Sequence, residues 1–468
     1  MTSRREFLNI VAGAAIGAAV RPSRAARPPN FVLMFTDDQR FDTIAALGHP
    51  VVKTPSMDRL VRRGVAFTHA CTQGGMIAGI CAPSRVQLMT GRSVFLAHRH
   101  IVAPTVPDPA FFTFPERLRA HGYETFATGK WHNSVGLLQK CFSSGASIFF
   151  GGMTDHLKVP VFDYNPVGDY PKNNARIAEG FSSEVFTNEA VKFLKRHDAA
   201  KPFLLYVAYT APHDPRMPPK RFADLYDPAT IALPGNFLPE HPFDNGALRV
   251  RDELLAGFPR TPDEVRRHLA GYYGMISEVD AEMGRVLDAV EQRADAANTY
   301  TIFAADNGLA VGQHGLMGKQ SLYDHSLRVP MVVTGPGVVR NKRAQGLCHV
   351  MDLSPTILEL AGLHVPAPLD GKSLAGALRQ PGAALRTDVM AAYQNVQRAV
   401  RTERWKLILY NVGGVRHTQL FDLASDPLET RNLAADTAHV SRVRELKALL
   451  ATRLKDAHDA IDFEKWSA

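Results

Sequence analysis

The sequence predicts an α/β fold, in which a large mixed, mainly parallel sheet is flanked by helices and followed by a smaller C-terminal subdomain of antiparallel sheet plus helix. Four short apolar runs alternate with long helical stretches, a pattern that favours parallel strands joined by helices. Each of these runs ends abruptly in polar residues, and from about Leu385 the pattern changes to closely spaced β-rich runs. The 468 residues, 45% of them hydrophobic, can bury a large core.

The first 26 residues resemble an export signal of the twin-arginine type. Arg4 and Arg5 precede a weakly apolar, Ala- and Gly-rich run to Val20, and small residues close the segment at Ala26. An ordinary N-terminal helix is the alternative, but this run has no polar face. We therefore predict a periplasmic or secreted protein. No stretch of the sequence reaches the roughly 20 apolar residues that a transmembrane segment requires.

Charge and cysteine content limit the possible partners. The formal net charge is +8, and it is +5 without residues 1–26, a mild excess that suits an anionic substrate. The sequence has no Lys/Arg run interleaved with aromatic residues and no zinc-ligand quartet, so we predict no nucleic-acid partner. The four cysteines are too few and too scattered for a disulfide framework: Cys71, Cys81, Cys141 and Cys348.

The first apolar run, Asn30–Thr36, is continuous, which is typical of a strand buried on both faces. It ends in Asp37 and Asp38, and the burial of two adjacent acids is unfavourable without a cation. The stretch Thr54–Arg63 then predicts a helix, because a threonine followed by a proline suits the N-cap and the first helical position.

Three further strands repeat the pattern of an apolar run followed by a polar cluster. Helical stretches at Ser183–Arg196 and Pro262–Arg293 separate them. Because the carboxyl ends of parallel strands meet at one edge of a sheet, we expect these polar residues to lie close together. The strands and the residues after them are Tyr123–Thr128 with Lys130 and His132, Pro202–Thr210 with His213 and Asp214, and Tyr300–Ala305 with Asp306 and Asn307.

Two long loop-like regions, Ser134–Gly180 and Asp227–Pro262, interrupt this order. Loops this long in a compact domain are usually functional walls or lids, so we expect them to contribute to substrate recognition; plain surface insertions are the alternative. A helix over Val350–Ala361 should end at Gly362. The C-terminal β-rich runs, which precede a final charged helix, are Val389–Tyr393, Arg398–Thr402, Trp405–Tyr410 and Gln419–Asp422.

The most specific motif lies in Cys81–Arg92, where Cys-x-Pro-Ser-Arg is followed by Thr-Gly. It resembles the signature of the formylglycine-dependent, type I sulfatase family, which belongs to the alkaline-phosphatase-like superfamily. In that family the cysteine is oxidised to formylglycine, an aldehyde that serves as the nucleophile once hydrated. Pro83 and Ser84 suit the start of a helix, so Cys81 should lie at its positive end. A buried, unmodified thiol is the alternative.

A candidate metal site consists of hard oxygen donors, which suit Ca²⁺ or Mg²⁺ better than zinc. Taken singly, each donor has another explanation, because Asp-Asn-Gly is a common turn and an Asp after a strand often caps a helix. The resemblance implies that the ion is calcium, with Mg²⁺ less favoured. It also implies that formylglycine completes the shell, so that the ligands are Asp37, Asp38, Cys81, Asp306 and Asn307.

A second group of candidate residues is basic. A transferring sulfuryl group keeps anionic oxygens throughout, and fixed positive charges stabilise it. Any one of these lysines would more often be a solvated surface residue. The resemblance implies that together they surround the sulfate, with Lys319 lying after a Gly-rich turn; the group is Arg85, Lys130, His132, His213 and Lys319.

The resemblance therefore implies a sulfuric ester hydrolase, with a sulfated carbohydrate as the expected substrate. Formylglycine would attack sulfur, His213 or Lys319 would protonate the departing alcohol, and His132 would take the proton whose loss releases sulfate. A formylglycine-generating enzyme would act on the chain during maturation. The resemblance makes residues 27–384 the catalytic domain and residues 385–468 a C-terminal subdomain.

Two other functions remain open from the sequence. Charges that hold sulfate also hold phosphate, so a phosphodiester or phosphonate monoester hydrolase on the same fold is the first alternative. An inactive glycan-binding relative with an unmodified Cys81 is the second.

Overall fold

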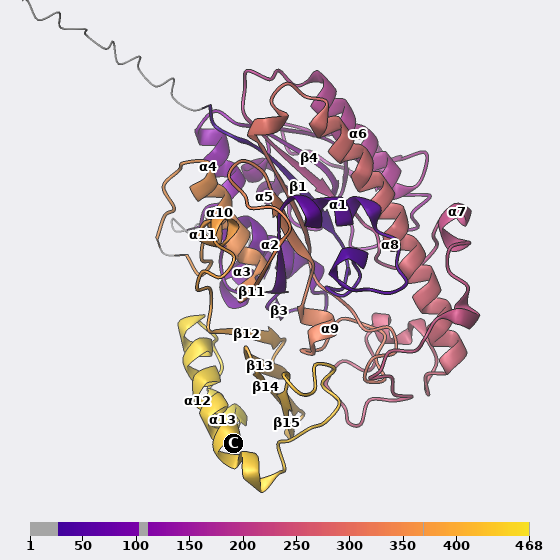
Figure 1. Cartoon of the computed structure of the whole chain (residues 1–468), viewed down its shortest axis with the longest axis vertical. Helices are drawn as coiled ribbons and strands as arrows, with labels where there is room; N and C mark the ends of the chain where they lie inside the picture. The colour runs from indigo at the N-terminus through magenta and orange to yellow at the C-terminus, as the bar shows by residue number, and fades with distance from the viewer. Residues whose placement is uncertain (1–26, 103–110, 368, 468) are drawn as a thin grey trace, which may run out of the picture.

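The computed structural model describes residues 27–102, 111–367 and 369–467 (Figure 1). The proposed export signal at residues 1–26 lies outside the described residues, and it stays a prediction. The fold class is confirmed: a large sheet with helices on both faces is joined to a smaller antiparallel sheet that carries the C-terminal helices.

The main sheet has eight strands in the order β11-β2-β10-β9-β1-β8-β4-β5. The four strands predicted from apolar runs are adjacent to one another at its centre, and all four are parallel. Their carboxyl ends therefore meet at one edge, as expected. These strands are β1 (Asn30–Thr36), β4 (Glu124–Lys130), β8 (Phe203–Ala208) and β9 (Thr299–Ala305).

The outer strands make the sheet mixed. The short strand β10 runs antiparallel to both of its neighbours, whereas β11 pairs in parallel with β2, and β5 pairs in parallel with β4. The bounds of these strands are β2 (Val65–Cys71), β5 (Ser144–Phe149), β10 (Met331–Thr334) and β11 (Lys342–His349).

Alternating side chains of β1 enter two separate cores, as expected for a strand covered on both faces. Val32 and Met34 pack in the core that includes α1 (Pro55–Arg63), α6 (Ser182–Arg196) and α8 (Pro262–Glu291). Phe31, Leu33 and Phe35 pack in the other core. The longer helices of that second core include α2 (Cys81–Thr90), α4 (Phe114–Ala120), α5 (Val135–Cys141) and α10 (Leu353–Leu360).

The prediction that residues 134–180 form a loop is wrong for part of its length. The segment contains α5 and the edge strand β5, because pairing with β4 orders a stretch whose own apolar pattern is weak. A two-stranded ribbon of β6 (Pro160–Val161) and β7 (Arg176–Ile177) follows. Residues 231–261, by contrast, are irregular apart from one 3-10 turn at Arg251–Leu255.

The C-terminal sheet has the order β15-β14-β13-β12-β3. Its last strand, β3 (Gly74–Gly75), comes from the main part of the chain and pairs in parallel with β12. The proposed domain boundary at residue 385 stays a prediction. The pairing of β3 with β12 joins residues from the two sides of this boundary in one sheet. The other strands and the helix packed on them are β12 (Asp388–Tyr393), β13 (Gln397–Thr402), β14 (Trp405–Val412), β15 (Val415–Asp422) and α12 (Val440–Asp456).

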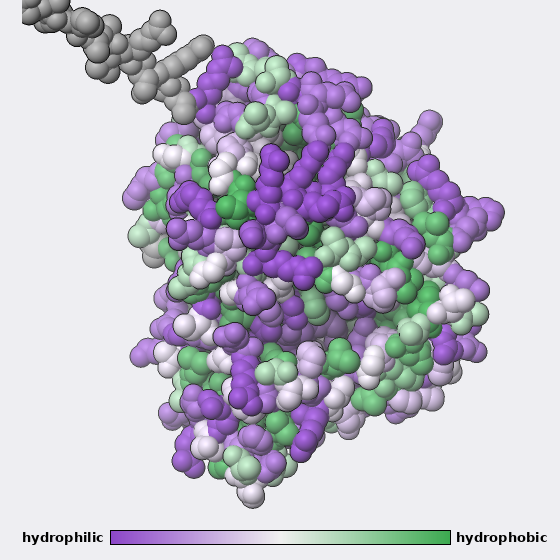
Figure 2. All heavy atoms as spheres, viewed as in Figure 1, coloured by the Kyte–Doolittle hydropathy of each residue, from purple (hydrophilic) through white to green (hydrophobic). Residues whose placement is uncertain are grey.

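The remaining helices are short and connect or cover these layers. They are α3 (Val94–Val102), α7 (Lys220–Ala223), α9 (Asp324–Leu327), α11 (Ala375–Arg379) and α13 (Phe463–Ser467). Figure 2 shows hydrophilic and hydrophobic side chains interspersed over one face of the molecule. Within the described ranges, no helix is both long enough and apolar enough to span a membrane.

A buried ionic cluster joins the C-terminal sheet to the main domain. Lys406 on β14 is fully buried and donates to Asp324 at 2.9 Å, and it also pairs with Glu429 at 2.7 Å. Glu429 accepts in turn from the backbone N–H of Asp324 at 2.7 Å. Burial raises the pKa of Glu429 to about 7 although Lys406 opposes the shift. Glu429 therefore depends on this lysine, whereas Asp324 also pairs with Arg328 and Arg401.

Replacing Lys406 with Met should lower the free energy of unfolding by about 3–5 kcal/mol, because the buried Glu429 loses its cation and Asp324 loses one of its three. Chemical denaturation of the two proteins measures this difference. Arg404→Ala is the matched control, since Arg404 pairs with Asp422 on the surface and its loss should change stability little. Similar small effects from both substitutions would contradict the proposed importance of the buried cluster.

Candidate active site

The carboxyl ends of the four central strands carry the candidate residues to one place. Asp37 and Asp38 follow β1, and the backbone N–H of Asp37 donates to the carbonyl of Ala211, after β8, at 3.2 Å. The N–H of Asp306, after β9, donates to the carbonyl of Thr36 at 3.1 Å. All ten predicted residues have contacts or electrostatic interactions within this group: Asp37, Asp38, Cys81, Arg85, Lys130, His132, His213, Asp306, Asn307 and Lys319.

Asp38 has a left-handed backbone conformation, with a φ of 64°. Such conformations are uncommon for residues other than glycine and persist where the surroundings fix them. The N–H of Asp38 donates to Asp306 at 3.1 Å, and its carbonyl accepts from the Tyr272 hydroxyl at 2.6 Å. These two bonds turn the Asp38 carboxylate into the site.

Cys81 begins helix α2, and its side chain is buried. Its Sγ lies 3.2 Å from Asp37 Oδ1 and 3.1 Å from Lys319 Nζ. Burial, together with the charge of Asp37, raises the pKa of the thiol well above its usual value. Because the thiolate is the reactive form, an unmodified Cys81 would be a weak nucleophile in this position.

Basic side chains meet each carboxylate. Lys130 pairs with Asp37, and Lys319 donates to Asp38 Oδ1 at 2.7 Å. Burial acts to raise the pKa of Asp37, but the charges of Lys130, His213 and Arg85 outweigh it and hold that pKa well below its usual value.

Arg85 has no exposed surface and fixes two strand ends at once. Its Nε donates to Asp306 Oδ2 at 3.1 Å, and its Nη1 donates to the backbone carbonyl of Lys130 at 2.7 Å. Despite this contact, burial and the negative charge of Asp37 raise the pKa of Asp306 to about 7. A further positive charge near Asp306 would therefore favour its ionised form.

The donor atoms fit a hard divalent cation. One oxygen or sulfur atom from each of Asp37, Asp38 and Cys81, with a His213 ring nitrogen, all lie within 4.8 Å of one another. Asn307 donates to Asp38 at 2.6 Å, and its own Oδ1 is buried without a hydrogen-bond partner among the described residues. Buried polar atoms are rarely left unpaired, and carboxylate and amide oxygens are the ligands that Ca²⁺ prefers.

The two histidines differ in their surroundings. His213 Nδ1 lies 2.8 Å from the backbone carbonyl of Asp214, so Nδ1 carries the proton and Nε2 faces Asp38 Oδ2 at 3.6 Å. His132, which follows β4, has its pKa lowered to about 2 by burial and by the charges of Lys130 and Arg85. Its ring is therefore neutral near pH 7.

Two charged neighbours of the site are not among the ten predicted site residues, although both stand in the predicted recognition loop at residues 227–262. Arg251, in the irregular segment after β8, pairs with Asp214 beside His213, and its side chain is 45% exposed. Glu253 accepts from the N–H groups of Met317 and Gly318 at 2.8 and 3.0 Å, which fixes the turn before Lys319. Only the presence of charged residues in a predicted recognition loop pointed to these contacts.

The chain matches two family models. The model described as Sulfatase matches residues 29–363, and the model described as N-sulphoglucosamine sulphohydrolase, C-terminal, matches residues 312–456. Among curated proteins, an N-acetylglucosamine-6-O-sulfatase of Bacteroides thetaiotaomicron is 24% identical over 93% of this chain and 88% of its own. An arylsulfatase of Clostridium perfringens is 26% identical over 91% of this chain and 94% of its own.

Solved structures share the fold. A protein in complex with its substrate D-glucosamine-2-N,6-O-disulfate has a TM-score of 0.77 and 22% identity, covering 94% of this chain and 100% of that one. A phosphonate monoester hydrolase of Agrobacterium radiobacter has a TM-score of 0.74 and 23% identity, covering 92% of this chain and 96% of that one.

The ring of His132 should stay neutral throughout the range from about pH 5 to pH 8, because its pKa is lowered to about 2. Histidine ring signals followed by NMR during a pH titration measure this directly, and His132→Gln identifies the signal. A midpoint near the usual histidine pKa of about 6.5 for that signal would contradict the described environment.

Proposed function

This chain belongs to the sulfatase family, and on that basis we propose that it releases sulfate from a sulfated carbohydrate with a formylglycine formed from Cys81 and a bound calcium ion. Its enzymatic class is that of the sulfuric ester hydrolases. The observation that carries the finer proposal is the setting of Cys81, whose Sγ lies 3.1 Å from Lys319 Nζ and 3.2 Å from Asp37 Oδ1 at the start of a buried helix.

Hydrated formylglycine supplies an oxygen nucleophile, and the cation supplies positive charge beside it. The thiol that residue 81 carries before modification cannot fill this role well, because its raised pKa keeps it protonated. We assign the cation to the oxygen donors at the ends of β1 and β9. Three carboxylates and an amide oxygen favour calcium over Mg²⁺, which keeps several waters and rarely has an all-protein cage. The proposed ligands are Asp37, Asp38, residue 81, Asp306 and Asn307.

The buried cations provide a fixed positive environment for the sulfate group. Lys319 Nζ contacts both Asp38 and Cys81, so it would be within hydrogen-bonding reach of an oxygen of a sulfate held at residue 81. Lys130 is fully buried, and Arg85 holds its backbone in place. In a water-excluded site such preorganised charges stabilise a transition state more than they could in water.

The two histidines are suited to opposite proton transfers. His132 is neutral, so a ring nitrogen is available for the proton that leaves the hydroxyl of residue 81 when sulfate departs, and the negative charge of a sulfate ester held there would offset the cations that lower its pKa. His213 presents Nε2 to the site while its Nδ1 is held by a backbone carbonyl. His213 or Lys319 therefore donates the proton to the departing alcohol.

A sulfated carbohydrate is the proposed substrate because relatives named for such substrates cover most of the chain. We further propose that residues 1–26 direct export by the twin-arginine route, to the periplasm or the exterior, after a formylglycine-generating enzyme has modified Cys81. Phosphonate or phosphodiester hydrolysis is the second candidate, favoured by the likeness to a phosphonate monoester hydrolase. The same cationic groups would hold a phosphoryl group.

Cys81→Ala should abolish turnover of an aryl sulfate while leaving the fold intact, because it removes the nucleophile and only a small side chain. Cys141→Ala is the matched control, since it also removes a buried thiol but lies in α5. Mass spectrometry of the Cys81 peptide from the native host should show the loss of sulfur that accompanies conversion to the aldehyde. An unmodified thiol in an active enzyme would refute the covalent mechanism.

Calcium should raise the thermal midpoint of the protein, because a ligand that binds only the folded state stabilises it by about 2.7 kcal/mol at 100 times its Kd. Asn307→Ala should weaken this response, since it removes the unpartnered amide oxygen. Asp252→Asn is the control, because this half-buried acid contacts Gln320 and Arg251 rather than the donor group. If calcium raised the thermal midpoints of the two variants equally, the ion would not be bound at this site.

Matched sulfate and phosphate monoesters and a phosphonate ester of one alcohol separate the two candidate activities. We expect kcat/KM to be highest for the sulfate ester. Higher kcat/KM for the phosphonate or for a phosphodiester would favour the second candidate.

A further inference from the structure

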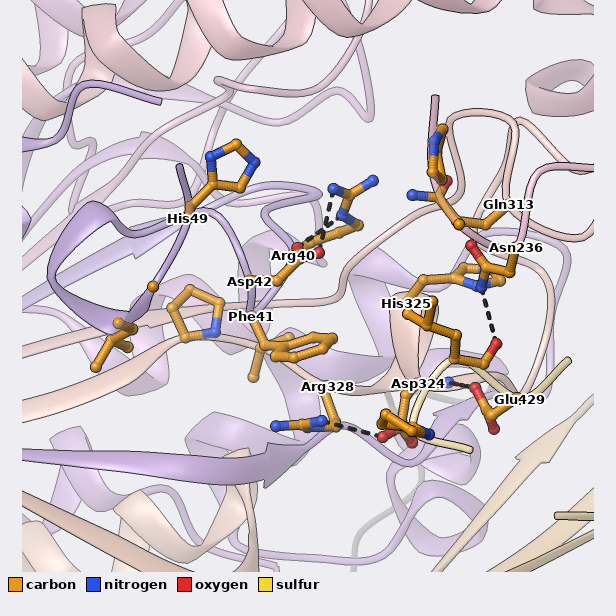
Figure 3. A pocket seen from close by; sticks show the side chains of 18 of the residues that line it. Arg40, Phe41, Asp42, His49, Asn236, Gln313, Asp324, His325, Arg328 and Glu429 are labelled. Carbon is orange, nitrogen blue, oxygen red and sulfur yellow. Dashed lines mark hydrogen bonds and ion pairs between the residues drawn. The ribbon is translucent and has the colours of Figure 1, made fainter. Parts of the chain in front are cut away.

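A second cavity lies beside the candidate site but is lined by none of its ten residues (Figure 3). Its volume is about 460 Å³, which is the size of a small-molecule site. Most of the walls come from four parts of the chain. These are the segment after β1, the loop at residues 232–236, α9 with the residues after it, and residues 427–429 beyond the C-terminal sheet. Further contributions come from Phe67 and Thr68 of β2, Tyr273 of α8, and Gln313.

The apolar part of the cavity wall consists of the Phe41 ring and several proline rings. The guanidinium of Arg328 covers the Phe41 ring at 3.7 Å from its centroid. Phe41 is half-buried, so the rest of its ring surface borders the cavity. Four prolines contribute further apolar surface around it: Pro50, Pro234, Pro330 and Pro427.

The positive charges of this cavity are already paired. Arg40 Nε donates to Asp42 Oδ1 at 2.9 Å, and Arg328 Nη1 donates to Asp324 Oδ2 at 3.2 Å. His49 adds no charge near neutral pH, because burial lowers its pKa to about 4. An anionic ligand would therefore face three carboxylates, those of Asp42, Asp324 and Glu429, while both guanidinium groups are already paired, so an uncharged ligand is favoured.

Hydrogen-bonding groups of both kinds border the apolar surface. His49 Nδ1 accepts from the backbone N–H groups of Val51 and Val52 at 3.1 and 3.0 Å, so its Nε2 carries the proton and can donate. The Asp42 side chain is 43% exposed and can accept. Gln313 accepts from the N–H of Val311 through its Oε1, which leaves its amide hydrogens for other partners.

We propose that this cavity is a second, non-catalytic binding site for an uncharged saccharide unit. A pyranose ring has an apolar face of C–H groups, which can stack on Phe41, and a rim of hydroxyls that both donate and accept hydrogen bonds. The cavity offers the complementary arrangement of an aromatic surface, a ring-nitrogen donor and a carboxylate acceptor. Because the guanidinium groups of Arg40 and Arg328 are already paired with carboxylates, we expect sulfated units to bind at the candidate active site rather than in this cavity.

Calorimetric titration of the full-length protein with maltose, cellobiose and N,N′-diacetylchitobiose tests this inference. We expect at least one of these uncharged disaccharides to bind with a Kd in the millimolar range, and N-acetylglucosamine 6-sulfate to bind the cavity more weakly than N-acetylglucosamine. None of the disaccharides carries a sulfate ester, so binding does not require hydrolysis. If the protein bound these disaccharides but hydrolysed no sulfate ester, the result would contradict the proposed function and leave the second binding site supported.

Two variants locate the binding. Phe41→Ala removes the stacking surface, and Ala232→Trp fills the cavity from an exposed position on its wall. Each should weaken binding by about tenfold or more, equivalent to about 1.4 kcal/mol. Phe258→Ala is the matched control, because Phe258 is also covered by a guanidinium at 3.7 Å, that of Arg260, but lies outside the cavity.

The inference is overturned if none of the three disaccharides binds an enzymatically active preparation. It is equally overturned if disaccharide binding survives both Phe41→Ala and Ala232→Trp, or if Phe258→Ala weakens it as much. Tighter binding of the sulfated monosaccharide in the presence of Cys81→Ala, lost in Ala232→Trp, would show that the cavity selects anions instead.

Discussion

The burial of three carboxylates at one point is the constraint on which the site depends. Isolated ionised carboxylates are strongly disfavoured in a protein interior, so each must meet a cation. Burial and the charge of Asp37 raise the pKa of Asp306 to about 7 even beside Arg85, so a further cation next to this carboxylate would stabilise its ionised form. The pairs that compensate the acids are Lys130 with Asp37, Lys319 with Asp38, and Arg85 with Asp306.

Close approach of the backbone makes this concentration of charge possible. Gly129, near the end of β4, has a φ of 94°, and a Cβ there would lie 1.9 Å from the carbonyl oxygen of Ala208. A Cβ on Gly308, directly after Asn307, would lie 2.1 Å from the carbonyl oxygen of His325. Only glycine fits either position without a shift of the backbone. The glycines thus let neighbouring segments bring their polar residues into one volume.

The correct predictions from the sequence rest on local hydrophobic patterns. The runs that became β1, β4, β8 and β9 are apolar enough to identify a buried strand on their own, and the geometry of parallel sheets then places their ends together. β11 could not be found in this way, because Lys342–His349 is a half-exposed edge strand that exists through its pairing with β2. The contacts of Arg251 and Glu253 were equally hidden, since they depend on the path of an irregular segment. Nothing in local sequence fixes that path.

The C-terminal sheet supports the site from outside the main sheet. β3 pairs with β12 and leads within six residues to Cys81, so the C-terminal sheet helps to fix the approach to helix α2. Asp324, five residues after Lys319, is held by Lys406 from the same sheet. The segments that carry Cys81 and Lys319 are thus anchored on strands beyond residue 385. The chain before and after residue 385 differs in sequence pattern, but the positions of Cys81 and Lys319 depend on contacts between the two parts.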